Sequence, residues 1–398
     1  MKRFLLGTLL GMGLLVLADA EPLKFLFHQG DQFRFYGTTI QNVTIDGQPY
    51  QKNVLLYRVS YSTAEASATD GLLRGHISFS AQPSDGEATG IDEEYDVEYR
   101  CDSLGRYTVD SEQLMPTVRS VPTLPGTELK PGDTWSARGE EVHDLRRSFG
   151  VDAPIRVPVD VSYTYRGTVL RDGQTLHVIQ SDYNLYKRTG FVSSDRGFFP
   201  VLLSGYSHQT HYFNAEKGRE EGYQEEYTLV LTLNNGHVIT YSGSGESRLA
   251  EAQTMDKPAL VEEVKKSLKD EGLGDVQVKA TPQGVSLNLD NILFPGDSAQ
   301  LVPSEQEKVR RIGEILRRYP DRDILVEGHT ADVVSATDPQ KLSQDRAAAV
   351  GNALVAAGVR TPEQITYRGW GASKPLMPND TEEHRTKNRR VEITLLEN

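Results

Sequence analysis

Short runs of alternating hydrophobic and polar residues fill the chain from residue 21 to about residue 247. In the clearest run, residues 157–165, valine and tyrosine alternate with polar residues, which is the period of a half-buried β-strand. Turn pairs that accept the backbone angles of a tight hairpin separate such runs: Asp46–Gly47, Asp172–Gly173 and Asn235–Gly236. This half has no convincing long helix. We therefore predict an antiparallel all-β region, built as one or two sandwich-like or barrel-like units.

From residue 258 onward, helical and strand periods alternate. The predicted elements are a helix after Pro258, strands at 276–278 and 285–289, a helix from 304 to 318, a strand at 323–327, a helix from about 343 to 357, and strands at 365–369 and 391–395. Ser304 and Glu307 have the spacing of a capping box at a helix start. This order predicts an α/β sandwich with helices on one face of a mixed sheet.

Changes in composition divide the chain. Lys2–Arg3, an apolar run from Phe4 to Leu17 and an Ala18–Ala20 cleavage motif predict a signal peptide at 1–20, because the run is too short to span a bilayer comfortably. A cluster of proline and glycine near 122–131 and a polar stretch before Pro258 mark further boundaries. We expect a β domain at 21–121, a second β domain or continuation of the first at 122–247, a linker at 248–258 and an α/β domain at 259–398.

Composition and charge narrow the function classes. The formal net charge of −13 disfavours a nucleic-acid partner. Cys101 is the only cysteine, so it forms no intramolecular disulfide, and we expect a half-buried strand cysteine. No spacing of a nucleophile, phosphate loop or metal site stands out. We expect a chain that is not an enzyme, has no cofactor and no metal, and is secreted to the periplasm, either free there or associated with the outer membrane.

The C-terminal region carries short motifs in a fixed order. They are Ile292–Phe294 with Ser298–Leu301, Glu327–Thr330, Leu342–Ser343 with Arg346–Ala347, Gly369–Gly371 with Pro375, Asn379, and Asn388–Ile393. In order and spacing they resemble the OmpA C-terminal family, the peptidoglycan-associating domain, over residues 259–398. The resemblance implies the α/β sandwich already predicted and a cell-wall ligand, and it does not extend to residues 21–247.

The resemblance also implies a ligand pocket. In the family, an Arg at a helix start holds the carboxylate of a peptidoglycan diamino acid, and an Asp directly after the Thr holds its ammonium group. Arg346 has the position of that Arg, where a guanidinium fork and a helix N-terminus both favour an anion. Thr330, Leu342 and Ser343 are further candidate contacts. Thr330 is explained first as a strand-end hydroxyl and Ser343 first as an N-cap, and both only second as ligand contacts.

Three positions of this pocket depart from the family pattern. Ala331 stands where the family has the Asp, Val334 replaces a Gly and Pro339 replaces an Asn. Asp332 comes one residue late, and a shift of one residue at a strand end turns a side chain the opposite way. Leaving one charge of a buried zwitterion unpaired costs about 2–5 kcal/mol, which corresponds to roughly thirtyfold to several-thousandfold in affinity.

We therefore interpret the chain as a non-catalytic periplasmic envelope protein with an OmpA-like cell-wall domain whose usual diamino-acid binding is lost or altered. Two alternatives stay open. One is a functional peptidoglycan-binding protein that uses Arg346 with Asp332 or Asp338. The other is an outer-membrane β-barrel protein anchored to the wall by its C-terminal domain. The expected partners are peptidoglycan or another wall component, and envelope proteins through the β region.

Overall fold

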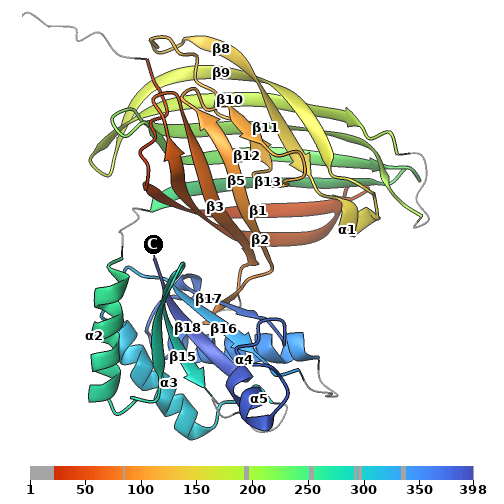
Figure 1. Ribbon diagram of the computed structural model, residues 1–398. Coiled ribbons are helices and arrows are strands. Elements are labelled where there is room, and N and C mark those ends of the chain that lie inside the picture. Colours follow the sequence, from red (N-terminus) through yellow and green to blue (C-terminus); the bar gives the residue numbers. More distant parts are fainter. Residues whose placement is uncertain are drawn as a thin grey trace, which may run out of the picture.

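The computed structural model describes residues 22–83, 86–191, 197–250, 255–290, 294, 298–332 and 338–397. A curved β-sheet body contains most of the first 250 residues, and an α/β body contains the rest (Figure 1). The predicted signal peptide, part of the predicted linker and Val334 lie outside the described residues.

The β body is one antiparallel sheet of twelve strands in the order β6-β5-β3-β2-β1-β13-β12-β11-β10-β9-β8-β7. Its strands are β1 Gln32–Ile45, β2 Gln48–Ala66, β3 Asp70–Ala81, β5 Glu93–Asp102, β6 Tyr107–Val109, β7 Val118–Arg119, β8 Thr134–His143, β9 Ile155–Arg171, β10 Gln174–Arg188, β11 Pro200–Asn214, β12 Arg219–Leu233 and β13 Val238–Ala250. The four-residue helix α1, Arg146–Phe149, follows β8.

The three hairpins predicted from turn pairs are confirmed. Asp46 and Gly47 adopt φ of 51° and 76° between β1 and β2, and Asp172 and Gly173 adopt 47° and 75° between β9 and β10. Gly236 has φ 89° between β12 and β13. These are the left-handed angles that the turn pairs allow at low energy. Antiparallel pairing of β1 with β13 then joins the two ends of this half of the chain.

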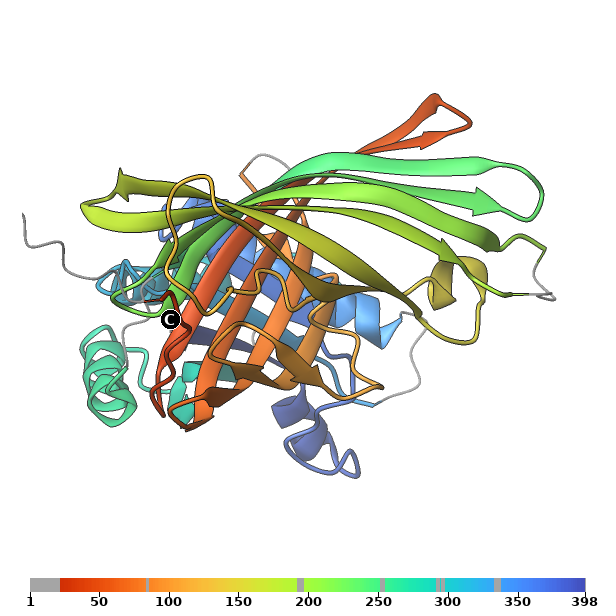
Figure 2. The same ribbon diagram turned by 90° about the horizontal axis from the view of Figure 1, so that it is seen from above.

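The sheet curls until its two outer strands nearly meet (Figure 2). The backbone N–H of Tyr107 in β6 donates to Ser120 Oγ, one residue beyond β7, at 2.9 Å. Alternate residues of β9 point into the enclosed core, including Val157, Val161 and Tyr163. The strands on both sides of the predicted boundary near residue 122 belong to this one sheet. The predicted all-β character is confirmed, whereas the sheet order does not confirm a sandwich.

The α/β body has a six-stranded mixed sheet in the order β14-β15-β18-β16-β17-β4. Its elements are α2 Lys257–Asp270, β14 Gln277–Thr281, β15 Gly284–Asp290, α3 Pro303–Leu316, β16 Ile324–His329, α4 Pro339–Ala356, the 3-10 turn η1 Pro362–Gln364, β17 Ile365–Gly369, α5 Glu382–Asn388 and β18 Arg390–Leu396. Buried residues of α2, α3 and α4 share one core with the strands. The predicted elements all exist, and the sequence missed α5.

Two predicted helix starts are wrong. Helix α3 begins at Pro303 with Val302 as its N-cap, so Ser304 and Glu307 form no capping box. Proline at the first helical position needs no hydrogen-bond acceptor there, which makes it a good start residue. Helix α4 begins at Pro339 rather than near Ser343. No helix in the described ranges is both long and apolar enough to cross a membrane.

The sixth strand of the α/β sheet comes from the other body. Strand β4, Thr89–Gly90, lies in the connection between β3 and β5 and pairs in parallel with Thr366 and Tyr367 of β17. The N–H of Ile91 donates to Tyr367 O at 2.9 Å, which extends the pairing. The two bodies therefore share a sheet edge.

Candidate functional site

The candidate pocket lies where strands β16 and β17 end against the first turns of helix α4. Thr330 N donates to Gly371 O and Trp370 N donates to Gly328 O, both at 2.9 Å, so the two strand ends stay paired. Glycine lets the helix approach them closely. A Cβ on Gly328 would lie 2.0 Å from Ser343 O, which excludes any other residue unless the helix moves away.

Ser343 fastens this helix to the strand ends. Its hydroxyl donates to Gln340 O and accepts from Gly371 N, both at 2.8 Å, and it is completely buried. The expectation that Ser343 is an N-cap is wrong, because Asp338 caps α4 by accepting from Gln340 N at 2.9 Å. Pro339 is the first helical residue, where its missing N–H has no consequence. Leu342 is buried beside Ser343.

Arg346 lies on the third turn of α4 and is 9% exposed. Its Nε donates to Ser298 O at 3.1 Å, and its guanidinium carbon lies 4.9 Å from the centre of the Phe294 ring. Ser298 and Phe294 both lie in the segment before α3, and both belong to the motifs that resemble the OmpA family. They hold the planar guanidinium in a fixed orientation, which favours recognition of a planar anion such as a carboxylate.

Ala331 and Asp332 have opposite environments. Ala331 is 2% exposed, whereas Asp332 is exposed. The backbone N–H of Asp332 donates to Asn379 Oδ1 at 3.2 Å, and that oxygen also accepts from Asn388 Nδ2 at 2.9 Å. The structure thus holds position 331 inward and position 332 outward. The buried Thr330 hydroxyl has no hydrogen-bond partner within the described part of the chain.

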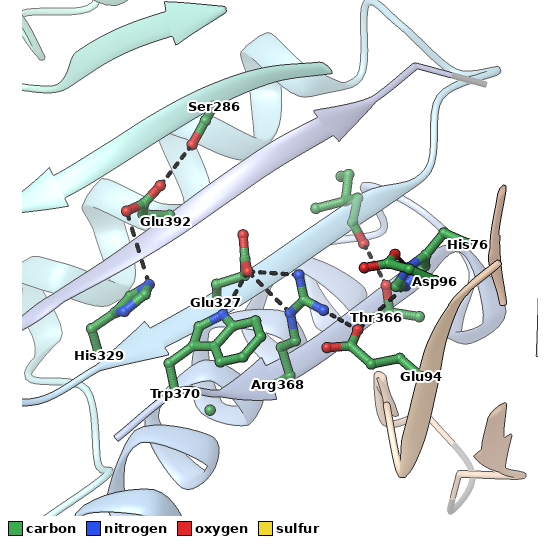
Figure 3. Close-up of polar contacts among 12 residues, drawn as sticks. His76, Glu94, Asp96, Ser286, Glu327, His329, Thr366, Arg368, Trp370 and Glu392 are labelled. Carbon is green, nitrogen blue, oxygen red and sulfur yellow. Dashed lines mark hydrogen bonds and ion pairs between the residues drawn. The ribbon is translucent and has the colours of Figure 1, made fainter. Parts of the chain in front are cut away.

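A layer of charged residues on the sheet lies next to the pocket (Figure 3). Glu327 Oε1 accepts from Trp370 Nε1 at 2.7 Å and from Arg368 Nε at 3.0 Å, and Arg368 also pairs with Glu94 of β5. Sequence reasoning missed this chain of contacts. Its signal was the polar residues at alternate positions on the face opposite the helices, Glu327 and His329 in β16 and Thr366 and Arg368 in β17.

His329 belongs to the same layer and is buried. Burial, helped by the positive charge of Arg390, lowers the pKa of His329 from 6.5 to about 3. Its Nε2 lies 3.9 Å from Glu392 Oε1, and Glu392 in turn accepts from Arg390 Nε at 2.7 Å. The imidazole is therefore neutral at physiological pH and forms part of the fold beneath Thr330.

Within the described residues, no group of three or more His, Cys, Asp or Glu side chains is placed to hold a metal ion. The pocket instead combines one oriented guanidinium with the Thr330 hydroxyl, which has no partner among the described residues. This set can bind an anion. The expected help of a helix N-terminus is wrong, because Arg346 lies on the third turn of α4 and Asp338 caps the first. Ala331, at the position where the family resemblance predicts an Asp, is buried and brings only a methyl group.

Comparisons with known proteins agree with the motif resemblance. Residues 293–389 match the OmpA family. The chain is 35% identical over 136 residues to a probable lipoprotein YiaD of Escherichia coli, covering 34% of this chain and 61% of that protein. It is 38% identical over 104 residues to the peptidoglycan-binding protein ArfA of Mycobacterium tuberculosis, covering 26% of this chain and 32% of that protein.

A solved structure also aligns with this region. It is the cell wall anchor of the T6SS from Pseudomonas aeruginosa, with 29% identity, coverage of 34% of this chain and 97% of that one, and a TM-score of 0.31. The chain thus spans less than two thirds of the two curated relatives. The predicted family is confirmed: residues 293–389 of this chain form an OmpA family domain.

Proposed function

We propose that this protein is a non-catalytic component of the bacterial envelope, located in the periplasm, whose OmpA-like domain faces the cell wall. We further propose that its binding of the usual peptidoglycan diamino acid is lost or weakened. One observation carries the second statement. The position of the family Asp is occupied by Ala331, which is 2% exposed, and the neighbouring Asp332 is exposed on the opposite side of the backbone.

The residues support a pocket that keeps half of its ligand chemistry. Ser298 O and the Phe294 ring orient Arg346, so its guanidinium can still bind a carboxylate. An ammonium group in the same pocket would face Ala331 instead of a carboxylate. Losing that charge pair is equivalent to about 2–5 kcal/mol, so an affinity in the micromolar range would fall to roughly the millimolar range at the upper end of this estimate.

Co-sedimentation with purified sacculi tests this proposal. We expect the wild-type protein to pellet weakly and Ala331→Asp to pellet with an affinity at least about tenfold higher. The gain should vanish in the double variant Ala331→Asp with Arg346→Met, which keeps most of the side-chain stem but removes the guanidinium. Arg310→Met, an exposed arginine of α3 that pairs with Glu307 and Glu314, is the matched control.

Strong binding by the wild-type protein that depends on Arg346 would overturn the weakened-pocket proposal. The alternative would then be a variant pocket in which Asp332 or Asp338 supplies the second charge. Asp332→Asn and Asp338→Asn separate these two. Asp338→Asn can keep the cap, because an asparagine oxygen also accepts from Gln340 N, so a loss of binding in that variant would point to the charge itself.

A further inference from the structure

The interior of the β body contains a cavity of about 510 Å³. This volume lies within the roughly 300–1,000 Å³ that is common for small-molecule sites. The cavity is bounded by residues of β1, β2, β3 and β5 on one side and of β8, β11 and β12 on the other. It is remote in sequence from the OmpA family domain and plays no part in the function proposed above.

One wall of the cavity is mainly apolar and aromatic. It is formed by side chains at alternate positions of neighbouring strands, among them Phe35, Val59, Leu73, Ile77 and Phe79. Many of the same residues form the small aromatic core cluster on β2, β3 and β5. These side chains offer surface for an apolar ligand but no hydrogen bonds. Cys101, predicted to be half-buried, is fully buried in this wall.

The opposite wall carries ordered polar groups. Glu225 accepts from Ser207 Oγ at 2.6 Å and from Gln209 Nε2 at 3.1 Å, and burial raises the pKa of its carboxyl group. Glu141 accepts from Tyr183 OH at 2.5 Å. A buried network of this kind fixes the orientation of its members.

Histidine extends this polar wall. His211 Nδ1 lies 2.7 Å from Glu220 Oε1, and its Nε2 lies 2.9 Å from Ser181 Oγ. His208, three residues earlier, lies on the outer face and pairs with Asp182, because residues three apart on a strand face opposite sides. The alternation of side chains along the strand therefore decides which polar residues of this segment face the cavity.

The first described residues close one end of the cavity. Phe25 N donates to Ser103 O at 2.9 Å and Leu26 N donates to Gly218 O at 2.8 Å, which ties this segment across two separate turns of the sheet. Glycines provide its seat. A Cβ on Gly218 would lie 2.3 Å from Leu26, and a Cβ on Gly71 would lie 2.6 Å from the Phe27 ring. These two hydrogen bonds and two glycines thus hold residues 25–27 in place against the cavity.

The charge inside the cavity is one-sided. Glu141, Glu220 and Glu225 line it, and among the described lining residues Arg219 is the only lysine or arginine. Arg219 is paired with Glu221 at 3.2 Å and lies over the Phe33 ring. A ligand that reaches the polar wall therefore meets an excess of acceptors over fixed positive charge, which disfavours an anionic group and favours a donor or a cation.

We infer that this cavity binds a single-chain amphiphile whose apolar tail lies against β1, β2, β3 and β5 and whose amine or hydroxyl head meets the glutamates of β8 and β12. A saccharide fits the lining less well. Apart from the tyrosine hydroxyls of β2, β5 and β6, the side chains of the mainly apolar wall offer its hydroxyl groups no hydrogen-bond partners, and each buried, unsatisfied polar group is destabilising.

Displacement of a fluorescent apolar dye by dodecylamine, dodecanol and dodecanoate tests the inference on the purified protein. The three probes share one tail and differ in the head. We expect the amine and the alcohol to displace the dye at concentrations at least about tenfold lower than the carboxylate. Ile77→Trp, which fills the apolar wall, should weaken all three probes together.

Two adjacent glutamates of β12 give a matched pair for the polar wall. Glu225→Gln should reduce the preference for amine over carboxylate severalfold, whereas Glu226→Gln, exposed on the other face of the same strand, should leave it unchanged. Melting curves identify any variant that does not fold. Equal displacement by dodecanoate, no displacement by any probe, or displacement only by a disaccharide would each overturn the inference.

Discussion

At the scale of single residues, the candidate pocket shows why a displaced carboxylate is not an equivalent one. Ala331 and Asp332 are neighbours at the end of β16, and the backbone of Asp332 is tied to Asn379. Turning position 332 inward would require reorienting its backbone, which would break that hydrogen bond and disturb the segment that Thr330 N pins to Gly371 O. A short side chain cannot compensate for a backbone direction, which is the physical basis of the proposal that the pocket is altered.

The buried His329 makes a prediction about pH. Its pKa is lowered from 6.5 to about 3 in the folded protein, mainly by burial and then by Arg390, with Lys374 and Arg368 acting the same way and Glu392 opposing them. In the unfolded chain the imidazole binds a proton below about pH 6.5, whereas in the folded chain it does not until about pH 3. Its stabilising contribution is therefore complete above pH 6.5 and is lost as the pH falls toward 3.

The expected slope is roughly 1.4 kcal/mol of unfolding free energy per pH unit below pH 6.5. Urea unfolding at about pH 7 and about pH 5 should thus differ by roughly 2 kcal/mol from this group alone. His329→Gln should remove that part of the difference, and His28→Gln, whose side chain is exposed, should not. A wild-type slope that His329→Gln leaves unaltered would show that the imidazole is not the group responsible.

At the scale of elements, the sequence predicted what local chemistry determines. The turn pairs at Asp46–Gly47 and Asn235–Gly236 fix hairpins because few residues tolerate positive φ. The buried stripe Val309, Ile312 and Leu316 fixes α3 by its period. The predicted helix starts are wrong where two local signals compete, since Pro303, one residue before Ser304, and Pro339, four residues before Ser343, are also good first residues.

The sequence patterns do not predict which strands pair when the strands lie far apart in the chain. Nothing in residues 32–45 indicates that β1 pairs with β13, two hundred residues later, and this pairing decides that the β region is one curled sheet. Strand β4 is two residues long, too short to have a period. The pocket residues were found because they lie in motifs, whereas the interior cavity depends on which strands become neighbours and could be recognised only in the fold.

The small strand β4 gives an element-scale prediction. Ala88, just before it, is 3% exposed within the α/β core, and its N–H donates to Asn352 Oδ1 at 2.8 Å. Ala88→Asp would bury an unpaired charge there, so we expect the segment to detach from β17. Hydrogen exchange should show faster exchange at the Ile91 amide, which donates to Tyr367 O, and unchanged protection at Trp370 N.

The control for this prediction is Glu87→Asp, an exposed neighbour that changes the side-chain length without burying a new charge. The destabilisation by Ala88→Asp cannot exceed the free energy with which the β4 segment binds the sheet edge. Beyond that value the segment detaches. If the Ile91 amide keeps its protection in Ala88→Asp, then the β4 pairing does not depend on Ala88 fitting into the core.

At the scale of the whole molecule, the two bodies are joined by more than a linker. The β4 pairing, the contact of Arg368 with both Glu94 and Glu327, and a cluster around Asp323 all cross between them. The charged face of the α/β sheet, which sequence patterns left unexplained, thus faces the β body. A ligand in the β body and a wall contact in the OmpA family domain would act on one connected assembly.

Asp323 tests that connection. It is 4% exposed, accepts from Tyr36 OH at 2.6 Å and lies 3.7 Å from both Arg34 Nη1 and Arg58 Nε of the β body. Asp323→Asn removes the carboxylate that these two arginines share, which for buried ion pairs is destabilising by about 3–5 kcal/mol. We expect calorimetry to show one main unfolding transition for the wild-type protein and two for the variant, because the bodies lose their coupling.

The exposed Asp321, two residues away, is the matched control, and Asp321→Asn should keep the single transition. The number of unfolding transitions distinguishes lost coupling from general destabilisation. If Asp323→Asn only weakened the α/β core, both bodies would still unfold together at a lower temperature. Two transitions, with the β body melting near its wild-type temperature, arise only if the cluster holds two independently folded units together. A single transition at the wild-type temperature would mean that the β4 pairing and Arg368 couple the bodies without it.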